Sequence, residues 1–330
     1  FNVQKVVVAV NKSAYRALIK FSQKDIDFIC HFVEEKVEEL GVHEIQIPEM
    51  HNIVEGALEK VNPIVAKSYR DYRNYKQDFV QMLDEVYKKS QSIMYIGDKE
   101  NSNTDSALVS TKRSLIFNEL NKELYKKFFL TVEELQAIRE GYIYIHDMSA
   151  RRDTMNCCLF DVKSVLTGGF EMGNLWYNEP KTLDTAFDVI GDIVLSAASQ
   201  QYGGFTVPSV DEILEPYAKR SHENHLNKYR SLGLSEEVAQ EIAWKDLEKE
   251  MEQGFQGWEY KFNSVSSSRG DYPFITMTSG TDISEYGKLV TKTMLEVRAG
   301  GQGKPGHKKP VLFPKIVFLY DENLHGPGKP

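Results

Sequence analysis

The chain has 330 residues, of which 41% are hydrophobic and 27% charged, and its formal net charge is −8. This acidic balance argues against a general nucleic-acid binder, which needs a basic surface, and no apolar run reaches the ~18 residues of a membrane helix. Three cysteines cannot build a disulfide framework, so a reducing, cytoplasmic setting is favoured.

The first ninety residues are predicted to be helical. Residues 25–40 place their apolar side chains on one stripe, and a second helix covers 48–61 after a proline suited to a first turn. A longer third helix covers 63–89. Three helices in so short a segment predict a compact accessory domain, which we place at residues 1–92.

A polar segment follows this domain. Residues 97–113 are rich in Asn, Ser, Asp and Thr and lack an apolar period, which predicts a loop. We therefore assign residues 93–112 as a linker. Two helices are predicted after it, at 113–129 and 131–141.

The remainder of the chain alternates strand-like and helical segments, which predicts an α/β architecture. The strand-like stretch MNCCLFDV is apolar enough for burial on both faces. Because the chain stops directly after its last strand-like run, we expect partner strands to be missing and the protein to be longer. The expected strands are 142–147, 155–162, 273–279 and 311–320, and the expected helical regions are 182–199, 209–262 and 283–297.

Cys157 and Cys158 are adjacent within one expected strand. Successive side chains of a strand point to opposite faces, so both thiols cannot face one pocket. Two interpretations stay open from these residues alone. Either one cysteine is a functional thiol with the other packed behind it, or both are small buried apolar residues.

His146 and Asp147 end another expected strand. Such a pair could act as acid and base, or it could cap the loop that follows. The eight histidines are scattered, and no His/Cys group has the spacing of metal ligands. The sequence therefore predicts no metal site within this chain.

Several stretches together carry a resemblance to one family. The segment from about Asn101 to the end resembles the anaerobic (class III) ribonucleoside-triphosphate reductases, which are glycyl-radical enzymes. The first ninety residues are similar to an ATP cone, although the basic-glycine hairpin that usually opens a cone would precede Phe1. The stretches that carry the resemblance are NSNTDS, EGYIYIHD, MNCCLFDVKSVLTGGFEMGN, EPKTLDTAFDVI, ASQQYGG, EYKFNSVSSSRGDYPFIT and VLFPKIVF, in this order.

The resemblance implies a ten-stranded α/β barrel of two antiparallel halves. Residues 113–330 would form its N-terminal part, and the remainder and the glycyl-radical domain would lie beyond the sequence. The implied activity is anaerobic reduction of ribonucleoside triphosphates to deoxyribonucleoside triphosphates, which supply DNA replication. A thiyl radical takes the 3′ hydrogen of the ribose, the 2′ hydroxyl leaves as water, and a second cysteine on a barrel strand supplies reducing hydrogen.

The same resemblance assigns residues to roles. The first cysteine of NCC matches the reducing cysteine of the family, which makes Cys157 the catalytic residue and Cys158 a packing residue. The SQQYGG stretch and the NCC and IHD motifs would border the substrate. The implied substrate-binding residues are Asn156, His146, Ser199, Gln200, Gly203 and Gly204.

Regulation by nucleotides is implied as well. Lys5, Lys67, Tyr69 and Arg73 fall where the family contacts ATP or dATP in the cone. For the last three, a solvated helix face is an equally good interpretation. Lys181 lies in a region that resembles the dimer-interface site for the deoxynucleotide effector that sets substrate choice, where a lysine could pair with a phosphate.

Cofactors and partners also follow from the resemblance. We expect a glycyl radical and a zinc site in the region beyond Pro330, magnesium with the nucleotides, a radical-SAM activating enzyme, and a homodimer or higher oligomer. Some members carry a histidine linked to formate where this chain has Tyr144. The reductant is therefore either formate or a thiol protein such as thioredoxin or glutaredoxin.

Two other functions compete with this one. A formate-lyase type of glycyl-radical enzyme also uses neighbouring cysteines but lacks a cone and the EPK…QQYGG series. A non-catalytic nucleotide-sensing regulator would use the cone alone, and it would have no reason to keep the barrel motifs.

Overall fold

The computed structural model describes residues 2–96, 107–152, 154–267 and 270–329. The chain divides into two compact units, Phe1–Lys88 and Lys89–Pro330, and the division falls inside one long helix. Each unit has its own hydrophobic core. The NSNTDS stretch, at 101–106, lies outside the described residues.

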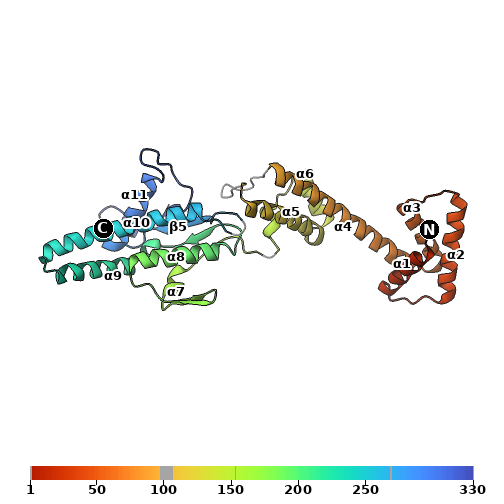
Figure 1. Ribbon diagram of the computed structural model, residues 1–330, viewed down its shortest axis with the longest axis horizontal. Helices are drawn as coiled ribbons and strands as arrows, with labels where there is room; N and C mark the ends of the chain where they lie inside the picture. The colour runs from red at the N-terminus through yellow and green to blue at the C-terminus, as the bar shows by residue number, and fades with distance from the viewer. Residues whose placement is uncertain (1, 97–106, 153, 268–269, 330) are drawn as a thin grey trace. The chain divides into compact units, whose positions relative to one another are not determined.

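The first unit is built from helices, as predicted (Figure 1). The helix α2 begins with a capping box, in which the side chains of Ser22 and Asp25 each accept a backbone N–H of the other residue. Pro48 occupies the first turn of α3, where its missing N–H leaves no hydrogen bond unmade. The helices of this unit are α1 (Val3–Arg16), α2 (Gln23–Leu40), α3 (Ile47–Val61) and the start of α4 (Pro63–Ile96).

The helix α1 is missing from the sequence prediction. Its run of valines is typical of strands, because β-branched side chains lose rotamer freedom in a helix. The side chain of Asn2 nevertheless caps its first turn by accepting the N–H of Gln4. Val6, Val10 and Ala14 recur at helical spacing and are buried in the core of the unit. Tertiary packing therefore outweighs the local preference here.

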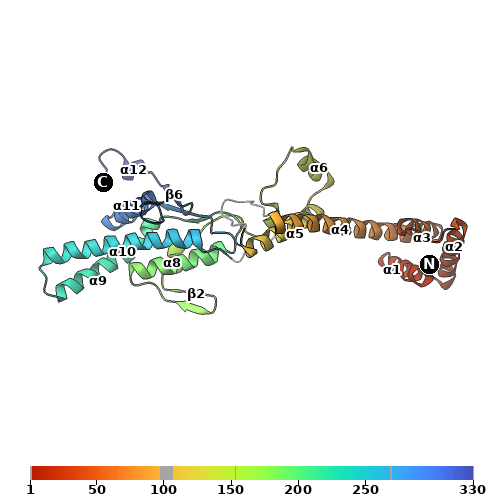
Figure 2. The ribbon, with the colours of Figure 1, turned by 45° about the horizontal axis from the view of Figure 1, so that its top comes forward.

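The second unit starts with the end of α4 and two further helices, α5 (Val109–Phe129) and α6 (Val132–Glu140) (Figure 2). The predicted helices 113–129 and 131–141 are thus confirmed. Helix α4 continues to Ile96 and α5 starts at Val109, so both helices extend into the segment we had assigned as a linker. None of the described helices is long and apolar enough to cross a membrane.

A parallel sheet of four strands, in the order β1-β4-β5-β6, forms the centre of the second unit. Phe205 and Val207 lie in register with Ile275 and Met277, and all four are buried in the core. Thr206 lies between them on the opposite face and is only half-buried. The strands are β1 (Cys158–Leu159), β4 (Phe205–Val207), β5 (Ile275–Ser279) and β6 (Lys315–Phe318).

Long helices connect these strands, which confirms the predicted α/β architecture, although helix predominates. Helices α9 and α10 form an antiparallel pair, and α8 and α11 pack against it (Figures 1 and 2). A hairpin of β2 (Phe170–Met172) and β3 (Leu175–Tyr177) was not predicted. The helices are α7 (Val162–Leu166), α8 (Leu183–Ala198), α9 (Val210–Ser231), α10 (Glu236–Ser264), α11 (Glu285–Gly300) and α12 (Glu322–His325), with a 3-10 turn at Met148–Ala150.

Two strand predictions need correction. Residues 142–147, all of them described, form a turn and irregular chain, and Tyr142 and Tyr144 are more than 80% exposed. A strand needs a neighbour for its backbone groups, and this segment has none beside it in the described sheets. In MNCCLFDV only Cys158 and Leu159 pair as a strand, and Leu159 is 77% exposed rather than buried.

Candidate functional site

Two glycines lie directly against the first of the adjacent cysteines. The backbone N–H of Gly204 donates a hydrogen bond to Cys157 Sγ at 3.3 Å. The N–H of Gly203 donates to the carbonyl oxygen of Asn156 at 2.6 Å. Four of the residues expected at the site, Asn156, Cys157, Gly203 and Gly204, are therefore brought together by the pairing of β1 with β4.

Gly203 is required by space. A Cβ atom at this position would lie 2.8 Å from Cys157 Sγ and closer still to Asn156 Oδ1, distances that real Cβ atoms do not show. At Gly204 a Cβ atom would meet Cys157 Sγ at 3.9 Å, which is ordinary contact. The backbone of the 203–204 segment can approach the thiol only because position 203 has no side chain.

Cys158 has different surroundings from Cys157. Cys157 is exposed, whereas Cys158 is half-buried and packs against the core of the unit. The Cys158 thiol donates to Gln201 Oε1 at 2.9 Å. Burial raises the pKa of this thiol, and the neighbouring Cys157 adds to the effect. The two sulfur atoms thus lie in different environments, although Cys157 itself precedes the strand β1.

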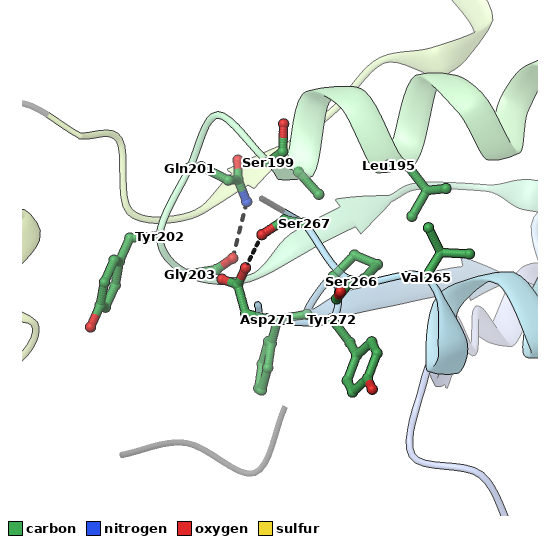
Figure 3. Close-up of a pocket in the computed structure, with 13 residues that line it drawn as sticks. Leu195, Ser199, Gln201, Tyr202, Gly203, Val265, Ser266, Ser267, Asp271 and Tyr272 are labelled. Atoms are coloured by element: carbon green, nitrogen blue, oxygen red, sulfur yellow. Dashed lines mark hydrogen bonds between the residues drawn. The ribbon is translucent and has the colours of Figure 1, made fainter. Parts of the chain in front are cut away.

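A small cavity of about 60 Å³ lies beside this constellation (Figure 3). Ser199 and Gly203, both expected at the site, are in its wall. Six further polar residues of the lining were not named individually, although all of them lie inside the stretches ASQQYGG and EYKFNSVSSSRGDYPFIT. A reading of every polar residue in those stretches could have found them. They are Gln201, Tyr202, Ser266, Ser267, Asp271 and Tyr272.

The remaining predicted residues of this region lie elsewhere. Gln200 is exposed, and its amide donates to Ser199 Oγ. His146 Nδ1 lies 2.5 Å from Asp147 Oδ2, and the imidazole is largely exposed. Asp147 has a φ of 51°, in the left-handed region, at the start of the 3-10 turn. Lys181 is exposed just before α8.

The first unit contains a much larger cavity, of about 1020 Å³, between α1, α3 and α4. Five basic side chains line it, and its lining includes no Asp or Glu. A cationic cavity with aromatic walls suits an anionic ligand with a planar ring. The basic lining residues are Lys5, Lys12, Arg16, Arg73 and Lys76, and the aromatic ones are His51, Tyr69 and Tyr72.

A hydrogen bond, an ion pair and a cation–π contact hold several of these side chains in place. His51 Nδ1 and the Tyr69 hydroxyl are 2.6 Å apart, and burial lowers the pKa of His51, with Arg73 adding to the shift. Arg73 also pairs at 2.9 Å with Glu55, a residue that does not line the cavity. The guanidinium of Arg16 lies 4.0 Å above the Tyr72 ring. The neutral imidazole of His51 can therefore donate or accept a hydrogen bond within a cationic surrounding.

Three of the four residues expected in the cone, Lys5, Tyr69 and Arg73, line this cavity. Lys67 does not, because its ammonium group pairs with Asp71 at 3.1 Å on another face of α4. Sequence reasoning missed Lys12, Arg16 and Lys76, whose only signal was their helical spacing from the predicted residues. Among the described residues no group of three or more His, Cys, Asp or Glu side chains could hold a metal ion.

The family model described as anaerobic ribonucleoside-triphosphate reductase matches residues 100–327, which is most of the chain. The chain belongs to this family. The resemblance seen in the sequence is thereby confirmed. A second family model, described as the ATP cone domain, matches residues 1–78, the segment that holds all lining residues of the cationic cavity except Val80.

Two curated relatives bear the name anaerobic ribonucleoside-triphosphate reductase. The one from Haemophilus influenzae is 31% identical over 98% of this chain and 46% of its own length. The one from Enterobacteria phage T4 is 33% identical over 68% of this chain and 37% of its own length. The chain thus spans less than half the length of these reductases.

A solved structure of the same family also matches. It is the anaerobic ribonucleotide reductase from Thermotoga maritima in complex with dATP and CTP. It is 16% identical, with a TM-score of 0.40, over 68% of this chain and 40% of its own.

Proposed function

We propose that this protein reduces ribonucleoside triphosphates to deoxyribonucleoside triphosphates under anaerobic conditions, with Cys157 as the reducing thiol. The observation that carries the proposal is the hydrogen bond from the Gly204 N–H to Cys157 Sγ, in a chain of the reductase family. An exposed thiol beside a small cavity can reach a ribose, whereas Cys158 is turned toward the core.

The chain's own residues would hold the substrate and deliver hydrogen. A thiyl radical elsewhere in the protein would remove the 3′ hydrogen of the ribose, and the 2′ hydroxyl would leave as water. Cys157 would then supply one hydrogen atom to the ribose and the external reductant the second, and the 3′ hydrogen would return from the first cysteine. Asn156, Ser199, Gln200 and the two glycines would border the substrate, and His146 would lie near it.

The proposal places these residues in a larger protein. Residues 1–92 would be the cone, 93–112 the linker and 113–330 the first part of a ten-stranded barrel. The radical glycine, the thiyl cysteine and a zinc site would lie outside the 330 residues, and a radical-SAM enzyme would generate the radical in the cytoplasm. Formate or a thiol protein would serve as reductant.

Nucleotides would also regulate the enzyme. ATP or dATP with magnesium would occupy the cationic cavity, where Lys5 and Arg73 meet the phosphates and Tyr69 lies beside the base. ATP would favour an active dimer, and dATP would shift the ensemble toward an inhibited form. A deoxynucleotide at the dimer interface, near Lys181, would set the choice of substrate.

The test is anaerobic turnover of CTP by the full-length protein after radical activation. Cys157→Ala should abolish product formation, and Cys158→Ala should retain it, because only the first thiol is in position. Calorimetry on the same protein measures ATP binding. Comparing binding with turnover separates the reductase from a nucleotide-sensing regulator. Binding without turnover, in a protein with a verified glycyl radical, would favour a nucleotide-sensing regulator.

A further inference from the structure

The side chain of Gln201 connects the two adjacent cysteines. This residue is only 4% exposed, although an amide normally seeks water. Its Nε2 donates to the carbonyl oxygen of Gly203 at 3.2 Å (Figure 3) and to that of Gly204 at 2.7 Å. Its Oε1 accepts the thiol of Cys158 at 2.9 Å. Every polar atom of the buried amide is therefore used.

These contacts fix which way the amide faces. Carbonyl oxygens accept hydrogen bonds and cannot donate them, so the end of Gln201 that meets Gly203 and Gly204 must be the NH₂ group. Its oxygen then necessarily faces Cys158. An amide oxygen needs a donor, and the only donor on a cysteine is its S–H. The arrangement therefore favours the protonated form of Cys158, because a thiolate would face the partial negative charge of the amide oxygen.

Cys157 has the opposite role in its hydrogen bond, because it accepts whereas Cys158 donates. The peptide that Gln201 holds by its carbonyl oxygens presents the N–H of Gly204 to Cys157 Sγ at 3.3 Å. The Cys157 sulfur is therefore the acceptor in this hydrogen bond, and a proton on it must point away from Gly204. One buried side chain thus makes Cys158 a donor and Cys157 an acceptor.

We propose that Gln201 is a positioning residue that selects Cys157, and not Cys158, as the reactive thiol. The role rests on the proposed function, in which Cys157 supplies reducing hydrogen, but the selection itself is a property of the free protein. Gln201 acts through Cys158 and the 203–204 peptide, and it needs no contact with the substrate. Cys158 then serves as the hydrogen-bond donor that holds the oxygen of Gln201 in place.

The first measurement is alkylation of the full-length protein by iodoacetamide without oxygen, with the modified cysteine located by peptide mass spectrometry. Cys157 should react at least about tenfold faster than Cys158, since one good hydrogen bond corresponds to roughly that factor. In Gln201→Met, which keeps the volume but no hydrogen bond, this ratio should fall to within about threefold. Gln240→Met changes an exposed amide of α10 and should leave the ratio as it is.

A purely structural role would loosen both cysteines alike, so a further readout decides. The infrared S–H band of Cys158, taken as the difference between wild type and Cys158→Ser, should be shifted to low frequency by its hydrogen bond to Gln201. This readout needs no Gln201 variant to fold.

The outcomes separate the two proposals. An unchanged ratio in folded Gln201→Met, or an S–H band at the free-thiol position, would overturn the role of Gln201. Turnover that survives Cys157→Ala would overturn the proposed function instead, whatever the alkylation shows. Loss of turnover in Cys157→Ala together with a collapsed ratio in Gln201→Met would support both.

Discussion

In the candidate active site, the backbone at Gly203 packs closely against both Asn156 and the Cys157 thiol. Gly203→Ala should displace both side chains, because its Cβ atom would lie 2.8 Å from Cys157 Sγ and closer still to Asn156 Oδ1. We expect a loss of about 1–3 kcal/mol in the free energy of unfolding, as in other overpacked sites, and loss of CTP turnover. Urea denaturation and the anaerobic assay measure the two effects.

The neighbouring glycine provides the control. In Gly204→Ala the new Cβ atom would meet Phe274 at 3.6 Å and Cys157 Sγ at 3.9 Å, which is normal packing. This variant should keep its stability within about 0.5 kcal/mol of wild type. Equal losses in the two variants would contradict the assignment of Gly203 to the close approach.

In the cationic cavity, residue-level predictions from sequence and from structure diverge at Lys67. Lys5→Met should weaken ATP binding about tenfold, because it removes a charge that lines the cavity. Lys67→Met should change the affinity by less than about twofold, since this ammonium group pairs with Asp71 outside the cavity. Isothermal titration with ATP decides, and a large effect of Lys67→Met would favour the sequence prediction.

Motifs in the sequence led to the backbone segments of the site but not to all of its side chains. Cys157 and the two glycines could be named because the reductase motifs contain them. Gln201 was passed over, since its role depends on the carbonyl groups of Gly203 and Gly204 and on the Cys158 thiol. These hydrogen bonds form only when β1 pairs with β4, which lie 40 or so residues apart in the sequence. No local pattern predicts that pairing.

Among the elements, the packing of α10 on α8 depends on Gly254. A Cβ atom there would lie 2.6 Å from Phe187 Cγ, in a buried cluster of Phe187, Phe255 and Trp258. Gly254→Ala should therefore destabilise the protein by about 1–3 kcal/mol despite the better helix propensity of alanine. Gly257→Ala, one turn along α10 and with open space around it, should instead stabilise by about 0.5–1 kcal/mol. Urea denaturation of both variants compares them directly.

A second prediction concerns His222, where α9 meets α10 and α11. Its Nδ1 is 2.9 Å from the Tyr286 hydroxyl, and its ring packs edge-on against Trp244. Its Nε2 has no partner among the described residues. Burial lowers the pKa of His222 below its ordinary value of 6.5, and His225 adds to the shift, whereas Glu285 and Glu223 oppose it.

The direction of the pH effect follows from this shift. Above pH 6.5 neither the folded nor the unfolded state binds a proton at His222. Below it the unfolded state takes up a proton first, so folding is progressively disfavoured as the pH falls. His222→Phe should therefore lose less stability than wild type between pH 7.5 and pH 5.5 in urea denaturation. His307→Asn, in an exposed turn, is the control, and an identical pH slope in wild type and His222→Phe would refute the prediction.

The helices and strands were predicted correctly from the sequence where tertiary packing and local pattern agree. The predicted helices at 182–199 and 283–297 correspond to α8 and α11, and 209–262 is helical apart from the turn between α9 and α10. The failures have a common cause. Residues 142–147 have the composition of a strand but no neighbouring strand, and α1 has valines but also a cap and a buried stripe.

For the whole molecule, the presence of two compact units with separate cores predicts two thermal transitions. Val54→Ala, in the core of the first unit, should lower one of them, and Val290→Ala, in the core of the second, should lower the other. Each substitution removes buried apolar groups and should cost roughly 2 kcal/mol. Scanning calorimetry of wild type and the two variants assigns each transition to its unit.

The same assignment tests the location of nucleotide binding. A ligand that binds only the folded cavity stabilises its unit by about 2.7 kcal/mol at a hundred times its dissociation constant. All residues that line the cationic cavity belong to the first unit. ATP should therefore raise the transition that Val54→Ala lowers and leave the Val290-sensitive transition in place. If ATP raised only the Val290-sensitive transition, the nucleotide would bind in the second unit, and the cavity between α1, α3 and α4 would not be its site.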